Sequence, residues 1–517
     1  MTKARAKTTG QFQWRGVVAL LLLWGLVFVV QGARAETEGP GNRADAVVVG
    51  LNDYVRLVVQ NNEEVASQFL EYQIRQESVK SEEGEFEPEF LTSYQRSVDK
   101  IRYSQEEKSA SIFAPERDEK SADFNAAVEL RTYTGTTVRL SHTTREYRDR
   151  ASDPDDQFKS QFMVEVTQPL LKGAGMAPRA RIEAAMENAQ EAFHTYRLRK
   201  MDTLLKALSA CWDYYGAKEK LRIRRESVKI AEQIVKDNRT RVQLGKMAET
   251  EILEAEAGLT KRKALESRAE QDVVAALNTV RSYISFSQKE SALDLRFDDE
   301  LEIPDRLPKV STSMQKAVVY RPEFNAARRK IKREEILLQF AKNQRWPQLD
   351  LRGTYGLNGL GDTTGDSWED ALKEDFRTWR VGATLSFPLF GGIKNRSEVR
   401  IAKLNKRRAI LELKALEVEI YNGISTAVKE VESAIEQLVF HSRTRQTNEL
   451  LLEVELTRFE AGRSNSRAVL TKEEDLISER EAELDGLVYT KKVLLSLAMN
   501  EGILLRDFGV EDMKIER

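Results

Sequence analysis

A proline-free stretch runs from Pro178 to Pro304, and a second begins after Pro388 and continues to the C-terminus. Both stretches are densely charged and carry apolar residues at helical spacing, which predicts amphipathic helices. Proline removes a backbone donor and clashes with the preceding turn, so its absence permits very long helices. From Ala177 to Leu244 there are 68 residues, or roughly 100 Å of helix. That length is too great for one compact domain, so we expect an elongated molecule.

Each stretch contains a glycine in a matching context. The first reads Arg241-Val-Gln-Leu-Gly245 and the second reads Arg458-Phe-Glu-Ala-Gly462. We predict that each stretch is a helical hairpin that turns just after its glycine.

The segments before the two stretches also match each other. Residues 52–83 and 313–344 both have the apolar spacing of an amphipathic helix, and extended segments follow at Pro88 and Pro347. The extended region is about twice as long in the first half, which predicts one extra hairpin near residues 121–150. A repeat of this length indicates a duplicated unit rather than a solenoid, whose repeats span about 20–50 residues.

Strict alternation replaces the helical period between the prolines. Apolar residues alternate with polar or small ones at Trp379, Val381, Ala383, Leu385 and Phe387. This pattern fits a transmembrane barrel that is apolar outside and polar inside. It fits equally an ordinary sheet with one face buried.

The expected connections between strands favour the barrel. Residues 104–120, 146–156 and 356–375 are long and polar, whereas the turn at Thr134-Gly135-Thr136 is short. Long loops at one end and short turns at the other are typical of outer-membrane barrels.

The N-terminus has the pattern of a signal peptide. Basic residues precede a short apolar run from Val17 to Val30, and Ala33-Arg34-Ala35 supplies small residues for cleavage before Glu36. An uncleaved anchor is the alternative. We therefore expect residues 1–35 to be removed and the mature protein to leave the cytoplasm.

Catalytic and metal-binding patterns are missing from the sequence. It has no Walker, zinc-protease, nucleophile-elbow or C-x-x-C motif, one cysteine (Cys211), and three widely separated histidines: His142, His194 and His441. Trp212-Asp-Tyr-Tyr215 is interpreted as core packing. A net charge of −2 gives no bias toward nucleic acid. We expect no enzyme, no metal, no cofactor and no nucleic-acid partner.

The duplicated order of helix, proline-led strands and glycine-containing hairpin resembles the TolC family of outer-membrane channel proteins. The most specific pieces are Arg321-Pro322-Glu323, Trp346-Pro347-Gln-Leu-Asp-Leu and Phe387-Pro388-Leu-Phe-Gly-Gly392, together with the two hairpin turns. The resemblance covers nearly all of the mature chain.

The resemblance implies an α+β fold with two internal repeats: a trimeric outer-membrane β-barrel continued by a long α-helical barrel in the periplasm of a Gram-negative bacterium. It implies a passive channel for efflux or type I secretion, with a periplasmic adaptor and an inner-membrane transporter as partners beside outer-membrane lipid. The expected segments divide as follows: signal peptide 1–35, leader and first helix 36–83, strands 84–170, hairpin 171–303, linker and helix 304–344, strands 345–390, and hairpin with tail 391–517.

The resemblance also places a closed entrance and the adaptor-docking surface at the hairpin tips. Carried over by position, Thr250 and Glu251 of the first tip would face Phe459 and Ser464 of the second, and Arg463 could pair with Glu251 instead. Gly245 and Gly462 would form the turns and could add to docking. The family's constricting acidic positions fall on non-acidic residues here, Ala468 and Thr471, but an acidic ring could come from Glu473, Glu474 and Asp475. Solvated charge at a hairpin tip is the alternative for each of these residues.

Two alternatives stay open from the sequence. If the extra hairpin joins the barrel, a trimer has 18 strands, and otherwise it has 12. The second function considered is a periplasmic coiled-coil adaptor or scaffold, although such proteins usually contain a single hairpin flanked by small β-domains.

Overall fold

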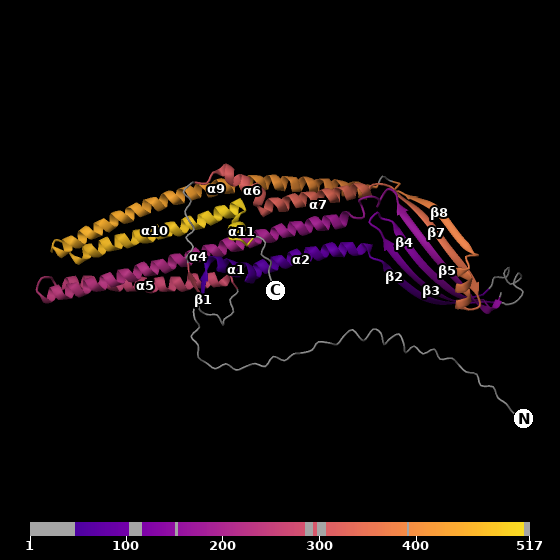
Figure 1. Ribbon diagram of the computed structural model, residues 1–517, viewed down its shortest axis with the longest axis horizontal. Coiled ribbons are helices and arrows are strands. Elements are labelled where there is room, and N and C mark those ends of the chain that lie inside the picture. The colour runs from indigo at the N-terminus through magenta and orange to yellow at the C-terminus, as the bar shows by residue number, and fades with distance from the viewer. Residues whose placement is uncertain are drawn as a thin grey trace, which may run out of the picture.

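The computed structural model describes residues 47–102, 116–149, 153–284, 293–296, 307–389 and 392–510. The molecule is a long rod with a curved sheet at one end and the turns of two helical hairpins at the other (Figure 1). The expected α+β class is confirmed as a mixture of helices and one antiparallel sheet of six strands. The expected signal peptide, residues 1–35, lies outside the described residues.

Two helices run nearly the whole length of the helical part. These are α4 (Ala180–Gln243, 64 residues) and α9 (Ile393–Glu460, 68 residues). Each is followed by a shorter helix that returns beside it, α5 (Thr250–Ser282) and α10 (Ser466–Glu501). The two hairpins lie side by side, and their turns form the end of the rod farthest from the sheet (Figure 1).

The helix expected over residues 52–83 is in fact two helices, α1 (Leu51–Asn61) and α2 (Glu63–Glu83). Asn62 separates them, because its side chain accepts hydrogen bonds from the backbone N–H groups of Glu64 and Val65, at 3.1 Å each. This is the geometry of a helix N-cap, which asparagine favours. A single turn of 3₁₀ helix, Gly84–Phe86, follows α2.

The helix expected over residues 313–344 is divided in the same way. It consists of α6 (Val310–Tyr320) and α7 (Pro322–Gln344). Pro322 occupies the first turn of α7, where its missing N–H costs nothing. The residue before a proline is driven toward extended backbone, and Arg321 has ψ 122°.

The break at Asn62 lies next to the end of α5, and the break at Arg321 lies next to the end of α10. We call the cross-section of the rod that contains these breaks and helix ends the seam. In the first half, Asn62 Nδ2 donates to the carbonyl oxygen of Tyr283, directly after α5, at 3.1 Å. In the second half, Gly502 follows α10 with φ +79°, and a Cβ there would lie 2.7 Å from the backbone nitrogen of Arg321. The short helix α11 (Leu504–Asp507) follows.

The hairpin expected over residues 171–303 is shorter than predicted. Its second helix ends at Ser282, and a strand, β6 (Leu293–Arg296), pairs in parallel with β1 (Val47–Gly50). The strand partner lies about 250 residues away in the sequence, so a local helical period could not reveal it.

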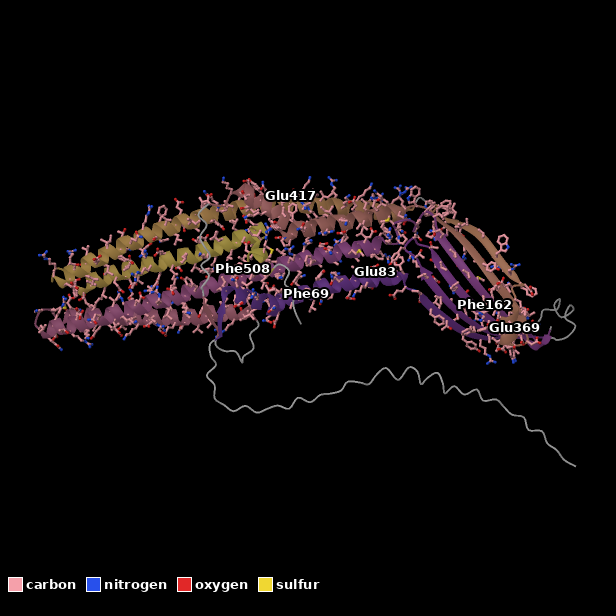
Figure 2. All side chains as sticks on the ribbon, viewed as in Figure 1. Phe69, Glu83, Phe162, Glu369, Glu417 and Phe508 are labelled. Atoms are coloured by element: carbon pink, nitrogen blue, oxygen red, sulfur yellow. The ribbon has the colours of Figure 1, made fainter. Side chains whose placement is uncertain are left out.

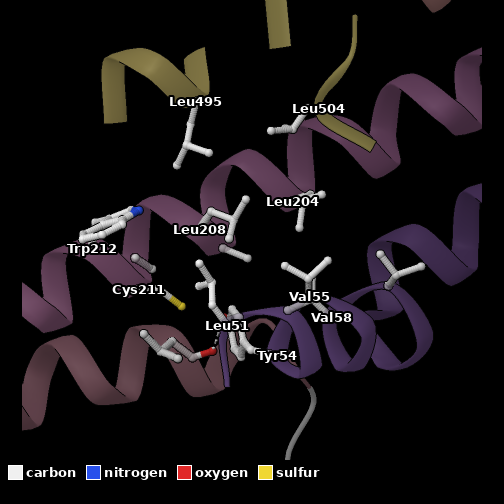
Figure 3. Close-up of a cluster of buried hydrophobic side chains, with 14 of the residues drawn as sticks. Leu51, Tyr54, Val55, Val58, Leu204, Leu208, Cys211, Trp212, Leu495 and Leu504 are labelled. Atoms are coloured by element: carbon white, nitrogen blue, oxygen red, sulfur yellow. Dashed lines mark hydrogen bonds between the residues drawn. The ribbon is translucent and has the colours of Figure 1, made fainter. Parts of the chain in front are cut away.

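The main apolar core lies at the seam, between α1, α4 and the end of α5 (Figure 3). Tyr54 is fully buried there, and its hydroxyl donates to the carbonyl oxygen of Val280 at 3.0 Å. Leu204 and Leu208 of α4 pack against it. Trp212 belongs to the same core, as its interpretation as a packing residue required. Cys211 is a buried free thiol, and burial raises its pKa to about 12.

The sheet has the order β2-β3-β4-β5-β7-β8, and all neighbours are antiparallel. Its strands are β2 (Glu89–Arg102), β3 (Glu116–Arg131), β4 (Thr137–Asp149), β5 (Asp153–Pro169), β7 (Gln348–Gly361) and β8 (Arg377–Ser386). The extra hairpin is β3–β4, and it lies inside the sheet rather than apart from it.

Two of the expected long loops differ in the structure. The connection expected over residues 146–156 is short, because β4 reaches Asp149 and β5 begins at Asp153. The loop expected over residues 356–375 contains the end of β7 and a helix, α8 (Thr364–Leu372). Of the loop expected over residues 104–120, residues 104–115 lie outside the described part of the chain.

Candidate functional site at the hairpin tips and on the sheet

The two hairpin tips share one turn geometry. Gly245 and Gly462 have φ +70° and +69°, the left-handed region that favours glycine. In the first tip the N–H of Lys246 donates to Arg241 O at 2.9 Å, and in the second that of Arg463 donates to Arg458 O at 2.8 Å. These bonds across six residues close the ends of α4 and α9 in the Schellman manner.

A buried asparagine joins the two tips behind the turns. Asn238 of α4 is fully buried, and its Nδ2 donates to Ser466 Oγ at 2.8 Å and to Glu251 O at 3.1 Å. The Glu251 carboxylate in turn accepts from the backbone N–H of Ser466 at 3.3 Å. The start of α5 is thereby tied to the start of α10.

An arginine makes the second contact between the tips. The guanidinium of Arg241 lies 4.5 Å from the centre of the Phe459 ring and donates to the Phe459 carbonyl oxygen at 3.3 Å. Phe459 is buried in a small apolar cluster with Ile234, Val235 and Leu470. The phenyl ring therefore contacts the neighbouring hairpin through a cation–π interaction.

The residues expected at the tips come together only in part. Glu251 reaches the second tip at Ser466, and among the described residues it has no ion pair with Arg463. Ser464 donates to Glu455 of its own hairpin instead of facing Glu251. Thr250 is exposed at the start of α5.

Sequence reasoning missed three contact residues, Asn238, Arg241 and Ser466. One signal for Asn238 was available: it continues the apolar stripe of Ala231, Ile234 and Val235 at helical spacing, so its amide had to be buried. A buried polar group needs a partner, which marks such a position as a specific contact.

A buried ion pair joins three helices farther from the tips. Arg262 of α5 and Glu473 of α10 are both almost completely buried, and Arg262 Nε donates to Glu473 Oε2 at 2.9 Å. Ser227 of α4 donates to Glu473 Oε1 at 2.7 Å and accepts from Arg262 Nε at 3.1 Å. We call Ser227, Arg262 and Glu473 the inter-hairpin clamp.

The clamp removes Glu473 from the expected acidic ring. Glu473 is buried and paired, so it cannot line a duct. Glu474 lies 3.7–3.8 Å from three basic side chains, and Asp475 pairs with Lys472 at 3.0 Å. Ala468 and Thr471 are at least partly exposed.

One face of the sheet is apolar and uncovered over most of its area. A single ladder row crosses all six strands through the following exposed side chains, which are 39–72% accessible: Phe90, Val128, Leu140, Val164, Tyr355 and Trp379. We call this side of the sheet the apolar face. An exposed patch this continuous indicates contact with another apolar medium or molecule.

The opposite face of the sheet is charged. Arg139 lies 3.7 Å from Glu129 on the neighbouring strand, Arg352 pairs with Glu165, and Arg145 pairs with Asp123. We call this side the charged face. Water on this side would solvate these cross-strand pairs.

Neither a metal site nor a membrane-spanning helix is found among the described residues. No group of three or more histidine, cysteine or acidic side chains there has the arrangement of a metal site. No helix there combines the length and apolarity needed to cross a membrane.

Comparison with known proteins gives a consistent result. The sequence model of the family described as outer membrane efflux protein matches residues 137–285 and 314–497. Outer membrane protein OprJ of Pseudomonas aeruginosa is 24% identical over 186 residues, which span 34% of this chain and about a third (36%) of that relative.

Solved structures show the same fold. The CmeC outer membrane channel of Campylobacter jejuni has a TM-score of 0.64 and 15% identity, covering 90% of both chains. The open state of the MtrE outer membrane channel of Neisseria gonorrhoeae has a TM-score of 0.63 and 15% identity, covering 87% of this chain and 88% of that one. The outer-membrane channel OprN has a TM-score of 0.64 and 15% identity, with coverage of 87% and 89%.

Proposed function

Because this chain belongs to the outer membrane efflux protein family, we propose that it is the passive outer-membrane channel subunit of a tripartite efflux or type I secretion system. This family consists of transport proteins rather than enzymes. The observation that carries the proposal is the apolar face, which crosses all six strands beside an opposite face lined with charge.

The apolar face fits lipid, and the charged face fits a water-filled duct. In lipid every backbone group must be paired, so the open edges of β2 and β8 require partners. We propose that three copies close one barrel, in which β8 of each protomer pairs with β2 of the next. Those two strands run in opposite directions, as an antiparallel barrel demands. With six strands per protomer the barrel has 18.

The helical part then extends into the periplasm as the wall of the duct. Its surface is rich in ion pairs that remain exposed, such as Lys429 with Glu432 and Arg222 with Glu226. A wall that is wet on both sides accounts for this polarity.

We propose the tips as the periplasmic entrance and the docking surface for an adaptor that links the channel to an inner-membrane transporter. The residues assigned are Gly245, Thr250, Glu251, Phe459, Gly462, Arg463 and Ser464. Their support is the pair of contacts that hold the tips together, Glu251 with Ser466 and Arg241 with Phe459. Thr250 and Arg463 are exposed and available to a partner.

Paired substitutions on the two faces of β5 test the membrane assignment. Val164→Arg places a charge on the apolar face, at a cost of about 2–4 kcal/mol if that face meets the bilayer centre. Gln161→Arg, on the charged face, is the matched control. We expect Val164→Arg to reduce assembled trimer in the outer-membrane fraction, whereas Gln161→Arg does not. Recovery of the unaltered chain in the soluble periplasm would favour an adaptor or scaffold.

Conductance in planar bilayers tests the entrance. Glu251→Ala removes the carboxylate that binds the second tip, so single-channel conductance should rise. Thr457→Ala is the control, because that exposed hydroxyl near the second tip donates within its own helix, to the carbonyl oxygen of Glu453 at 3.0 Å. An unchanged conductance in Glu251→Ala would remove Glu251 from the gate.

A further inference from the structure

The helix α8 lies directly on the apolar face, at the end of the sheet far from the long helices (Figure 1). Two glycines of β7 permit this close approach. A Cβ on Gly359 would lie 2.0 Å from the carbonyl oxygen of Ser367, and one on Gly361 would lie 2.6 Å from the nitrogen of Ser367. No side chain larger than hydrogen fits at either position.

Where α8 covers the apolar face, the strand residues beneath the helix carry hydroxyl groups. Thr144 and Ser160 stand opposite each other on β4 and β5, and both are buried although they lie on the side of the sheet that carries Phe124. The hydroxyl groups of Ser367 on α8 and Ser160 form a hydrogen bond with 2.7 Å between their oxygens. Trp368 Nε1 donates to Thr144 Oγ1 at 3.2 Å. The helix therefore satisfies hydroxyl groups that would otherwise face apolar surroundings.

The surface of α8 that stays exposed carries both apolar and charged side chains. Trp368 packs edge-on against Phe162 and still exposes 41% of its surface, while Leu372 exposes 65%. Charged residues such as Glu369 stand beside them, and Figure 2 shows Glu369 close to Phe162 at the far end of the sheet. Tryptophan flanked by charge is typical of the boundary between acyl chains and headgroups.

We propose that α8 is an interfacial helix on the outside of the barrel, with Trp368 and Leu372 against the acyl chains of the outer leaflet. The helix continues the lipid-contacting surface across a gap of hydroxyl groups on the strands. This inference rests on the proposed function, because it takes the apolar face to be the lipid side. The partner is membrane lipid rather than an extracellular protein or a neighbouring copy.

Quenching by brominated lipid tests the proposal in the assembled protein. Three variants each keep one tryptophan, Trp368, Trp379 or Trp212, with the others beyond the signal peptide replaced by phenylalanine. They are reconstituted in phosphatidylcholine vesicles brominated near the headgroup end of the acyl chain. Trp379 stands on the apolar face and is the positive control for contact with lipid. Trp212 lies in the buried helical core and is the negative control.

We expect the fractional quenching of Trp368 to be at least half that of Trp379 and several-fold above that of Trp212. Quenching of Trp379 with none at Trp368 beyond the Trp212 level would overturn the inference and leave the proposed function standing. Trp379 at the Trp212 level would overturn the proposed function itself.

A glycine pair on β7 tests how α8 is seated. Gly359→Ala should displace α8, shift the emission of Trp368 to longer wavelength and change its quenching. Gly353→Ala is the matched control, since Gly353 lies on the same face of the same strand and an added Cβ meets nothing within 4 Å. An identical Trp368 spectrum in both variants would contradict the seating of α8 on the sheet.

Discussion

At the scale of single residues, Arg262 and Glu473 form a buried ion pair. Both charges are removed from water, and each depends on the other and on Ser227 for compensation. A buried pair of this kind contributes little net stability compared with apolar residues, but breaking it leaves one charge unpaired. The inter-hairpin clamp therefore acts mainly to fix one arrangement of α4, α5 and α10.

We predict that Arg262→Ala destabilises the helical part by about 3–5 kcal/mol, because the buried Glu473 carboxylate then keeps its hydrogen bond from Ser227 but has no positive charge to balance it. The double variant Arg262→Met with Glu473→Met should recover most of this loss. Thermal unfolding followed by circular dichroism at 222 nm measures both. Lys429→Ala, which breaks a surface pair, should not change the midpoint. A double variant as unstable as the single one would show that packing, not charge, controls the site.

A second residue makes stability depend on pH. Burial, together with the positive charges of the neighbouring Arg197 and Arg329, lowers the pKa of His194 from its ordinary 6.5 to about 4. The folded state thus prefers the neutral imidazole. The contribution of neutral His194 to the free energy of unfolding is fully present above pH 6.5, and it is lost as the pH falls from 6.5 toward 4.

We predict that His194→Gln flattens the fall in melting temperature between pH 6.5 and 4. Above pH 6.5 the pH dependence of the two proteins should be the same. Melting curves at half-unit pH intervals measure this. If both proteins lose stability in parallel below pH 6.5, another group is responsible.

At the scale of elements, the two hairpin turns depend on their glycines. Gly245 and Gly462 occupy left-handed backbone with open space around them, so conformation rather than crowding requires glycine. Left-handed backbone costs other residues roughly 1–2 kcal/mol, and asparagine less than most.

Gly245→Ala should therefore lower the free energy of local opening of the first tip by about 1 kcal/mol, and Gly245→Asn should lower it less. Amide hydrogen exchange of the peptide spanning residues 238–250 measures the difference. Gly258→Ala serves as a contrasting site, because there a Cβ meets Leu470 Cδ1 at 2.9 Å and crowding is the cause. Equal exchange in the alanine and asparagine variants would argue against a conformational origin.

The sequence predicts long elements well and short interruptions poorly. The hairpin turns were found because the glycine context is repeated and no proline interferes. The breaks at Asn62 and Arg321 were missed because apolar spacing continues through them, although Pro322 was a visible signal. The segment of α8 is predicted as a loop from its sequence, because the residues against which the helix packs lie on strands outside the segment. At the tips, Asn238 and Ser466 lie on different hairpins, so only the tertiary structure could pair them.

For the whole molecule, the number of strands would set the width of the proposed barrel. In the proposed trimer the position of β3–β4 inside the sheet favours the larger of the two counts considered, because a hairpin that is bonded on both sides would have to stay in the barrel wall. With strands about 4.8 Å apart and tilted about 40°, 18 strands give a barrel diameter of about 36 Å, against about 24 Å for 12.

We predict the wider barrel for the trimer in detergent, measured by electron cryomicroscopy. A variant lacking residues 116–149 should give the narrower one if it assembles, since β2 would then meet β5 directly. A full-length barrel of about 24 Å would contradict the inclusion of β3–β4.

The seam has a mechanical consequence for a rod of this length. Among the described helices of the helical part, α4 and α9 alone pass through the seam, while the other helices of that part end or begin there and are held by contacts such as Asn62 with Tyr283. The bending stiffness of the rod is lower at a cross-section that fewer continuous helices pass through. A load applied at the tips is thus carried past the seam by α4 and α9, and the rod flexes there before it flexes at the sheet.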